Sequence, residues 1–224
     1  DRKHNIHPDR DLASRAAKLR GAIEVLSMAS RSGIEVPAQK LEQIRDRIRG
    51  LIGELSMTQN RDGGWGWAGG SSTHRTSAAV LIALGKANNA GFSVPQAVLG
   101  KAIPAVENMF RSAVSSRNDL KAHLLDALAV CGVGDFAAAN RLHRSRDRLS
   151  NGTLSHLISS LVSMKRLPMA SEAASLLLSR RNADGSWSGG PGVKEAGDYW
   201  CRDPLVITAM AVGSCASAGK SAAW

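Results

Sequence analysis

Apolar residues recur at intervals of three and four along most of the chain, which is the pattern of amphipathic α-helices. The first stripe consists of Leu12, Ala16, Leu19, Ile23, Leu26 and Ala29. It stops at Gly33, and Pro37 begins the next element, in keeping with the usual signals for helix ends and starts. No segment alternates convincingly with a period of two, so the sequence predicts an all-α fold of about nine helices.

The other stripes place these helices along the chain and suggest that they repeat. They predict helices over residues 41–55, 76–90, 96–113, 119–131, 135–145, 153–165, 169–181 and 203–217. Gly33–Pro37 resembles Gly91–Pro95 at an offset of 58 residues, and Gln59–Trp65 resembles Arg181–Trp187 at an offset of 122. Because the second offset is close to twice the first, we expect a regular array of helical hairpins. Within it, residues 120–131 and 153–164 look like eroded copies of one inward-facing helix.

The glycine-tryptophan loops at the two ends of the longer repeat are predicted to be structural joints. The residues concerned are Gln59, Asp62, Gly63, Trp65 and Trp67 in the first loop and Asp184, Gly185 and Trp187 in the second. An aspartate before glycine can accept hydrogen bonds from the following amides, and glycine takes the positive φ that such a turn needs. The tryptophan can cover the preceding helix end and offer its N–H to a carbonyl. Neither loop supplies a nucleophile or a general base.

Composition indicates a basic globular protein. Apolar residues make up 43% of the 224 residues and charged residues 21%, whereas only 4% are aromatic, so alanine and leucine must build most of the core. No apolar run approaches the roughly 18 residues of a membrane span. Cys131, Cys201 and Cys215 show no CxxC spacing, which argues against a zinc knuckle or a disulfide framework.

The formal net charge of +10 permits an acidic partner. Arginines gather in two groups, one at positions 45, 47 and 49 and one at 141, 144, 146 and 148, with two more at 180 and 181. Glu42 and Asp46 accompany the first group, which predicts a solvated helix face. The second group could dock an acidic neighbouring domain or bind polyanions weakly. Because aromatic residues are not interleaved with it, no specific nucleic-acid site is predicted.

One loose cluster of potential ligands stands apart from these loops. Asp198, Cys201 and Asp203 lie close together in sequence, and His123 could join them. A zinc site would need Asp198, Cys201 and one of His123, His143 or His156, but the Asp-to-Cys spacing departs from that of known zinc-containing toroid enzymes. A loop packed around a small buried thiol is the alternative, and we predict no cofactor and no metal.

Gln59–Trp65 fits the Gln-x3-Gly-x-Trp pattern of the α/α-toroid superfamily, which includes squalene and terpene cyclases, prenyltransferase β subunits and thioester domains. The second copy departs from this pattern by carrying Arg181 in place of glutamine. The chain resembles most the thioester domain of bacterial α2-macroglobulins, through Asp62–Trp67, the helix Thr76–Gly85, the turn Gly91–Val94 and the segment 203–211. This resemblance implies an incomplete α/α toroid over residues 12–217, with an N-terminal extension over 1–11 and a tail over 218–224.

The same resemblance implies a function in protease entrapment, in or beyond the periplasm. The partners would be neighbouring domains of a larger chain and, through them, proteases. A reactive thioester domain carries Cys-x-Glu-Gln upstream of the glycine-tryptophan loop, yet Arg10–Arg15 contains no cysteine. Either the chain begins just after that motif or the motif has been lost, and the spacing favours loss. A non-catalytic domain is therefore expected; the alternative is an isoprenoid-binding enzyme related to the cyclases or prenyltransferases.

Overall fold

Nine α-helices make up most of the described chain, which in this computed structural model comprises residues 12–31, 35–66, 70–114, 117–191 and 203–219. They are α1 Leu12–Arg31, α2 Ala38–Met57, α3 His74–Asn89, α4 Gln96–Ser112, α5 Asn118–Val130, α6 Phe136–Arg144, α7 Asn151–Ser163, α8 Leu167–Ser179 and α9 Pro204–Ser217. A short 3-10 helix over Arg146–Arg148 was not predicted. The predicted all-α class is confirmed, and no strand is found in the described segments beyond one isolated bridge.

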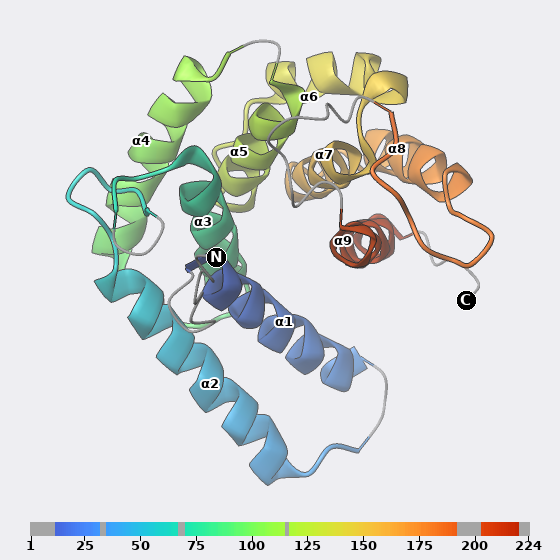
Figure 1. Cartoon of the computed structure of the whole chain (residues 1–224). Helices are drawn as coiled ribbons and strands as arrows, with labels where there is room; N and C mark the ends of the chain where they lie inside the picture. The colour runs from blue at the N-terminus through green and yellow to red at the C-terminus, as the bar shows by residue number, and fades with distance from the viewer. Residues whose placement is uncertain (1–11, 32–34, 67–69, 115–116, 192–202, 220–224) are drawn as a thin grey trace, which may run out of the picture. The chain divides into compact units, whose positions relative to one another are not determined.

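The chain divides into two compact units, unit 1 over Asp1–Met109 and unit 2 over Phe110–Trp224. In unit 1, α1 packs against both α2 and α3 (Figure 1). The interior of this unit is made mainly by α3, whose residues are buried around most of the helix surface. A helix buried in this way must carry small and apolar side chains on all its faces, as the alanines and leucines of α3 do.

In unit 2, α7 is the central helix and contacts α5, α6, α8 and α9. Leu154, Leu157, Ile158 and Leu161 of α7 are fully buried in one apolar cluster. Removal of such side chains from water is the main stabilising contribution to a core of this kind, at about 1.5–3 kcal/mol each. Among the described helices, none is both long and apolar enough to span a membrane.

Helices α3, α5 and α7 all end in the same turn. In each, a backbone N–H just beyond the helix donates to a carbonyl five residues earlier: Phe92 to Ala87 (3.0 Å), Val133 to Leu128 (3.0 Å) and Arg166 to Leu161 (2.8 Å). The residue before each donor has a positive φ, as this type of helix end requires. Gly91 and Gly132 occupy that position in α3 and α5, whereas in α7 it is Lys165, with a φ of 58°.

Replacing Lys165 with glycine should stabilise unit 2 by about 0.5–1 kcal/mol, because a Cβ disfavours the left-handed conformation. Urea denaturation followed by circular dichroism would measure the gain. Lys165→Ala is the matched control: it removes the ammonium group but keeps the Cβ, so it should give no such gain. Equal stabilisation by alanine and glycine would show that the backbone conformation is not the cause.

Candidate functional site

The loop after α2, which we call the first joint (Gln59–Trp65), ties three helices of unit 1 together. The Trp65 indole is fully buried, and its Nε1–H donates to the carbonyl of Leu55 in α2 at 2.8 Å. The Trp65 backbone N–H donates to Ser77 Oγ in α3 at 2.9 Å. Gln59 Nε2 donates to the carbonyls of Gly63 and of Val98 in α4, both at 2.9 Å.

The loop after α8, the second joint (Arg181–Trp187), repeats this geometry in unit 2. Trp187 is fully buried, and its Nε1–H donates to the carbonyl of Leu177 in α8 at 2.7 Å. Its backbone N–H donates to Thr208 Oγ1 in α9 at 3.0 Å. Gly63 and Gly185 have the same φ of 86°. The tryptophan-to-carbonyl hydrogen bond predicted for these loops is therefore present in both. In each joint it fixes the loop to the end of the preceding helix.

The aspartates of the two joints favour their charged forms. The Ser72 hydroxyl and the Gly64 backbone N–H donate to Asp62 Oδ1 and lower the pKa of that carboxyl. The Ser186 hydroxyl and backbone N–H act in the same way on Asp184 and lower its pKa. Each aspartate accepts a hydrogen bond from a backbone N–H of its own joint, so protonation of either aspartate should loosen the turn.

Stability should therefore fall on acidification. A carboxyl whose pKa is lowered by folding stabilises the folded state above its unfolded pKa, near 3.9, and this contribution disappears as the pH falls through the lower folded value. In Asp62→Asn/Asp184→Asn, which keeps an acceptor oxygen, the loss of stability below about pH 4 should be smaller than in the unaltered protein. Urea melts between about pH 2 and pH 6 would measure the difference. Parallel curves for the two proteins would contradict the assignment.

Three ionisable side chains meet inside unit 2. His156 Nδ1 of α7 donates to Asp126 Oδ2 of α5 at 2.8 Å, and the His123 ring stacks on the His156 ring with centroids 4.4 Å apart. All three are buried, with His156 only 4% exposed. The carboxylate fixes the tautomer and orientation of His156, as buried polar pairs require. A solute could not reach these groups without local opening of the helices.

The sequence contained a signal for this cluster. Aligning residues 120–131 with residues 153–164, the two copies of the inward-facing helix, places His123 opposite His156 in the next copy. His123 and Asp126 are three residues apart and so lie on one face of α5. The sequence prediction instead assigned His123 to a ligand group near residue 200 and did not pair Asp126 with a histidine.

Replacing Asp126 with alanine should lower the free energy of unfolding by about 1–3 kcal/mol, because it removes the acceptor for a buried imidazole N–H. Asp126→Asn retains an acceptor oxygen and should cost less. Chemical denaturation of the two variants would separate them. If the asparagine variant lost as much stability as the alanine variant, the hydrogen bond to His156 would not be the stabilising element.

The loose ligand group predicted near residue 200 is only partly described. Asp198 and Cys201 lie outside the described residues, as does Trp67 of the first joint. The Asp203 carboxylate accepts a hydrogen bond from the Leu205 N–H at 2.9 Å and caps α9. His123 lies against His156, as described above. Within the described segments no group of three or more His, Cys, Asp or Glu side chains is arranged so that it could hold a metal ion.

Two of the three cysteines lie in the described chain. Cys131 follows the end of α5, and Cys215 is buried in α9. Burial raises the pKa of both thiols to about 11. The thiolate is the reactive form of cysteine, so both groups are poorly suited to act as nucleophiles near neutral pH.

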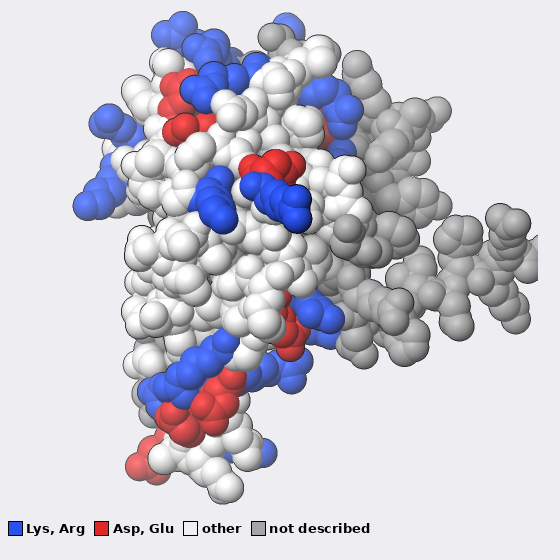
Figure 2. Space-filling model, turned by 90° about the vertical axis from the view of Figure 1, so that its left-hand side faces the viewer, with Lys and Arg blue, Asp and Glu red and all other residues white. Residues whose placement is uncertain are grey.

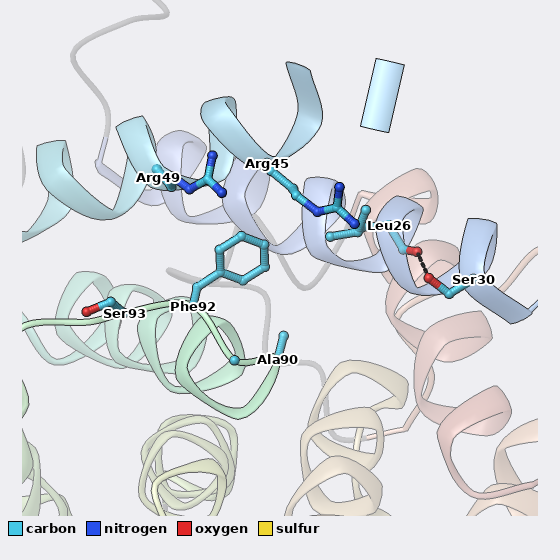
Figure 3. A pocket seen from close by; sticks show the side chains of 8 residues that line it. Leu26, Ser30, Arg45, Arg49, Ala90, Phe92 and Ser93 are labelled. Atoms are coloured by element: carbon cyan, nitrogen blue, oxygen red, sulfur yellow. Dashed lines mark hydrogen bonds between the residues drawn. The ribbon is translucent and has the colours of Figure 1, made fainter. Parts of the chain in front are cut away.

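An open groove of about 470 Å³ lies in unit 1, beside the turn that ends α3. Arg45 and Arg49 of α2 line this groove together with Phe92; in Figure 3 the Arg49 side chain points toward the Phe92 ring and that of Arg45 extends toward Leu26 of α1. Both arginines bind Glu42, at 3.0 and 3.1 Å, and Arg49 also binds Asp46 at 2.7 Å. The predicted solvated face is confirmed, because these ion pairs are exposed and the acids neutralise the arginines.

The face shown in Figure 2 has the same character, since acidic side chains there mostly lie against basic ones. The arginines of α6 differ. Arg141 and Arg144 of α6, and Arg148 of the 3-10 helix that follows it, are exposed and form no ion pair with any residue in the described segments. Arg180 has a structural role that its sequence position did not indicate: it donates to the carbonyls of Leu149 and Asp147, both at 2.8 Å, and holds the 3-10 turn.

The sequence matches no protein-family profile and no curated protein. Twelve chains among solved structures do match in fold. A mutant Salmonella α2-macroglobulin has a TM-score of 0.69 at 17% identity, covering 96% of this chain and 14% of that one. Native Escherichia coli α2-macroglobulin, from domain MG7 to the C-terminus, has a TM-score of 0.57 at 20% identity, covering 77% and 29%. The trypsin-activated form from Escherichia coli has a TM-score of 0.58 at 18% identity, covering 93% and 16%.

These relatives are much longer than the chain, which spans at most 29% of each of the three. The matches extend over both units, since the Salmonella structure covers 96% of the chain. At 17–20% identity they establish the architecture. The chain therefore has the all-helical fold of the thioester-domain region of bacterial α2-macroglobulins.

Proposed function

We propose that this chain is a non-catalytic, thioester-like toroid domain of a bacterial α2-macroglobulin-type protein that traps proteases. Its partners would be neighbouring domains of that protein, in the periplasm or outside the cell. The domain would act mechanically, by packing against its neighbours and moving when a protease cuts a bait segment. The observation that carries this proposal is the fold shared with α2-macroglobulins, supported by the tryptophan joint that ties helices together in each unit.

The absence of a reactive thioester has separate support. The sequence has no Cys-x-Glu-Gln motif. Cys131 and Cys215, the cysteines of the described segments, have raised thiol pKa values. A thioester needs the sulfur of an activated cysteine to hold its acyl group. Neither Cys131 nor Cys215 is activated in this way, because burial raises the pKa of both thiols.

Methylamine tests the loss of the thioester directly, because it opens such a bond by forming an amide and releasing a thiol. We expect the intact mass and the free-thiol content of the full native protein to remain unchanged after methylamine treatment. A mass gain of one methylamine with one new thiol would overturn the non-reactive assignment. The result does not depend on whether the protein traps proteases.

Entrapment is tested with trypsin and the full native protein. A trapped protease should still cleave a small chromogenic peptide but should lose activity on a large protein substrate. The trapping protein would surround the protease and keep large substrates away from its active site. The complex should also dissociate in denaturant, since no covalent bond holds it. Undiminished digestion of the large substrate at excess binding protein would overturn the trapping function.

A further inference from the structure

Two turns of unit 2 lie side by side and present an unusual mixture of side chains. Arg166, in the turn between α7 and α8, places its guanidinium 4.5 Å from the centre of the Phe136 ring at the start of α6. Val133 precedes α6, and Lys165 and Leu167 flank Arg166. We call these five residues the α6–α8 surface.

The apolar members of this surface are exposed. Leu167 is 55% exposed, Val133 42% and Phe136 39%. Single exposed apolar residues need no explanation, but a group that includes an aromatic ring stacked by an arginine has the composition of a binding hot spot. In unit 1 the corresponding turn at Phe92 is flanked instead by Arg45 and Arg49 of α2, in the groove described above.

The charged members leave the surface strongly positive. Lys165 forms no ion pair with any described residue, and no acidic residue lies in the first turn of α8. Arg141 and Arg144 continue the positive charge along the exposed side of α6, within about 12 Å of Phe136 at the rise of an α-helix. The nearby carboxylate of Asp135 accepts the Ala138 N–H as the cap of α6. Glu172 of α8 lies 3.5 Å from His143 Nε2 and 3.8 Å from Arg146, so in the described segments no carboxylate is paired with Lys165, Arg141 or Arg144, in contrast to the arginines of α2.

The backbone supports a role for the lysine side chain. Lys165 is the only described non-glycine residue with a positive φ, and it occupies a turn position that is glycine in α3 and α5. Its ammonium group has no hydrogen-bond or ion-pair partner among the described residues that would offset the energetic cost of the positive φ. Strained residues kept in this way often serve a binding function.

We propose that the α6–α8 surface binds an acidic protein segment that carries a large apolar side chain. The apolar side chain would lie against Val133, Phe136 and Leu167, while carboxylates of the segment would face Lys165 and the arginines of α6. A polyanion alone would satisfy the cations but would leave the apolar group exposed, so a protein segment fits better. This inference does not rest on the proposed function, because any protein could supply such a segment.

The probe is a short fluorescent peptide of Asp and Glu with a central Leu-Trp pair, titrated at low salt by anisotropy. Leu167→Ser/Arg166→Gln should weaken its binding about tenfold, the effect expected when two contacts of a hot spot are lost. The matched control is Met28→Ser/Arg45→Gln, an exposed methionine and an arginine of unit 1, which should leave binding unchanged. Circular dichroism and thermal melting would confirm that both variants fold.

Two further ligands make the result decisive. The same peptide with serine in place of Leu-Trp should bind at least about tenfold more weakly, because it lacks the apolar contact. Heparin should show no dependence on Leu167. Equal binding of the two peptides, or heparin binding that exceeds that of the peptide, would overturn the proposal in favour of a polyanion site. No saturable binding at millimolar peptide would overturn it outright.

Discussion

Replacing Trp65 with alanine is expected to lower the free energy of unfolding by about 3–5 kcal/mol. The indole is fully buried, and its N–H donates to the Leu55 carbonyl, so the change opens a cavity and removes a hydrogen bond at the same site. Trp187→Ala should cost a similar amount in unit 2. Denaturant unfolding followed by far-ultraviolet circular dichroism would measure both, independently of the lost fluorescence.

Trp65→Phe separates the two contributions. Phenylalanine fills much of the space but cannot donate, so the Leu55 carbonyl keeps only the hydrogen bond from the Thr58 hydroxyl and loses the one from the indole. We expect a smaller loss, of about 1–3 kcal/mol, in this variant. If Trp65→Ala cost less than about 1 kcal/mol, the first joint would not be a stabilising element, because a buried tryptophan normally contributes far more.

Gly63→Ala is expected to cost about 2–5 kcal/mol, which combines backbone strain with a steric clash. Gly63 has a φ of 86°, and a Cβ at this position would lie 2.3 Å from the carbonyl oxygen of Lys101 in α4. Because that oxygen belongs to helix backbone, it cannot move aside cheaply. The substitution should therefore push α4 away from the first joint.

Gly91→Ala is the matched control. Gly91 has nearly the same φ, 85°, but a Cβ there would meet nothing within 4 Å. It should cost only about 1–2 kcal/mol, the price of the left-handed conformation alone. The difference in stability between the two variants, measured by urea denaturation, reports the clash with Lys101. Equal losses would mean that α4 adjusts without strain.

Helix positions could be predicted well because their signals are local. The stripe from Leu12 to Ala29 and the helix start after Pro37 depend on periodicity and on the φ preferences of single residues. The joints could be predicted for a related reason: the hydrogen bonds of Asp62 and Trp65 reach partners only 2 to 12 residues away along the chain, so most of the geometry of the motif is set by the adjoining sequence.

Contacts between distant helices were harder to predict. Arg180 was grouped with surface arginines, yet it holds backbone carbonyls about 30 residues earlier in the chain. The pairing of Asp126 with His156 depends on how α5 packs on α7, and the sequence of either helix alone does not indicate that packing. Lys165 has an ordinary side chain, and only its equivalence to Gly132 reveals its unusual backbone conformation.

Each unit contains one fully buried indole in a joint, Trp65 in unit 1 and Trp187 in unit 2. These two residues are therefore natural spectroscopic reporters for the separate units. In chains that keep only one of the five tryptophans and carry phenylalanine at the other four positions, emission would shift to longer wavelength when the unit containing the remaining indole opens. Coincident transitions from the two single-tryptophan chains would mean that the units unfold as one cooperative body, whereas two separate midpoints would give each unit its own stability.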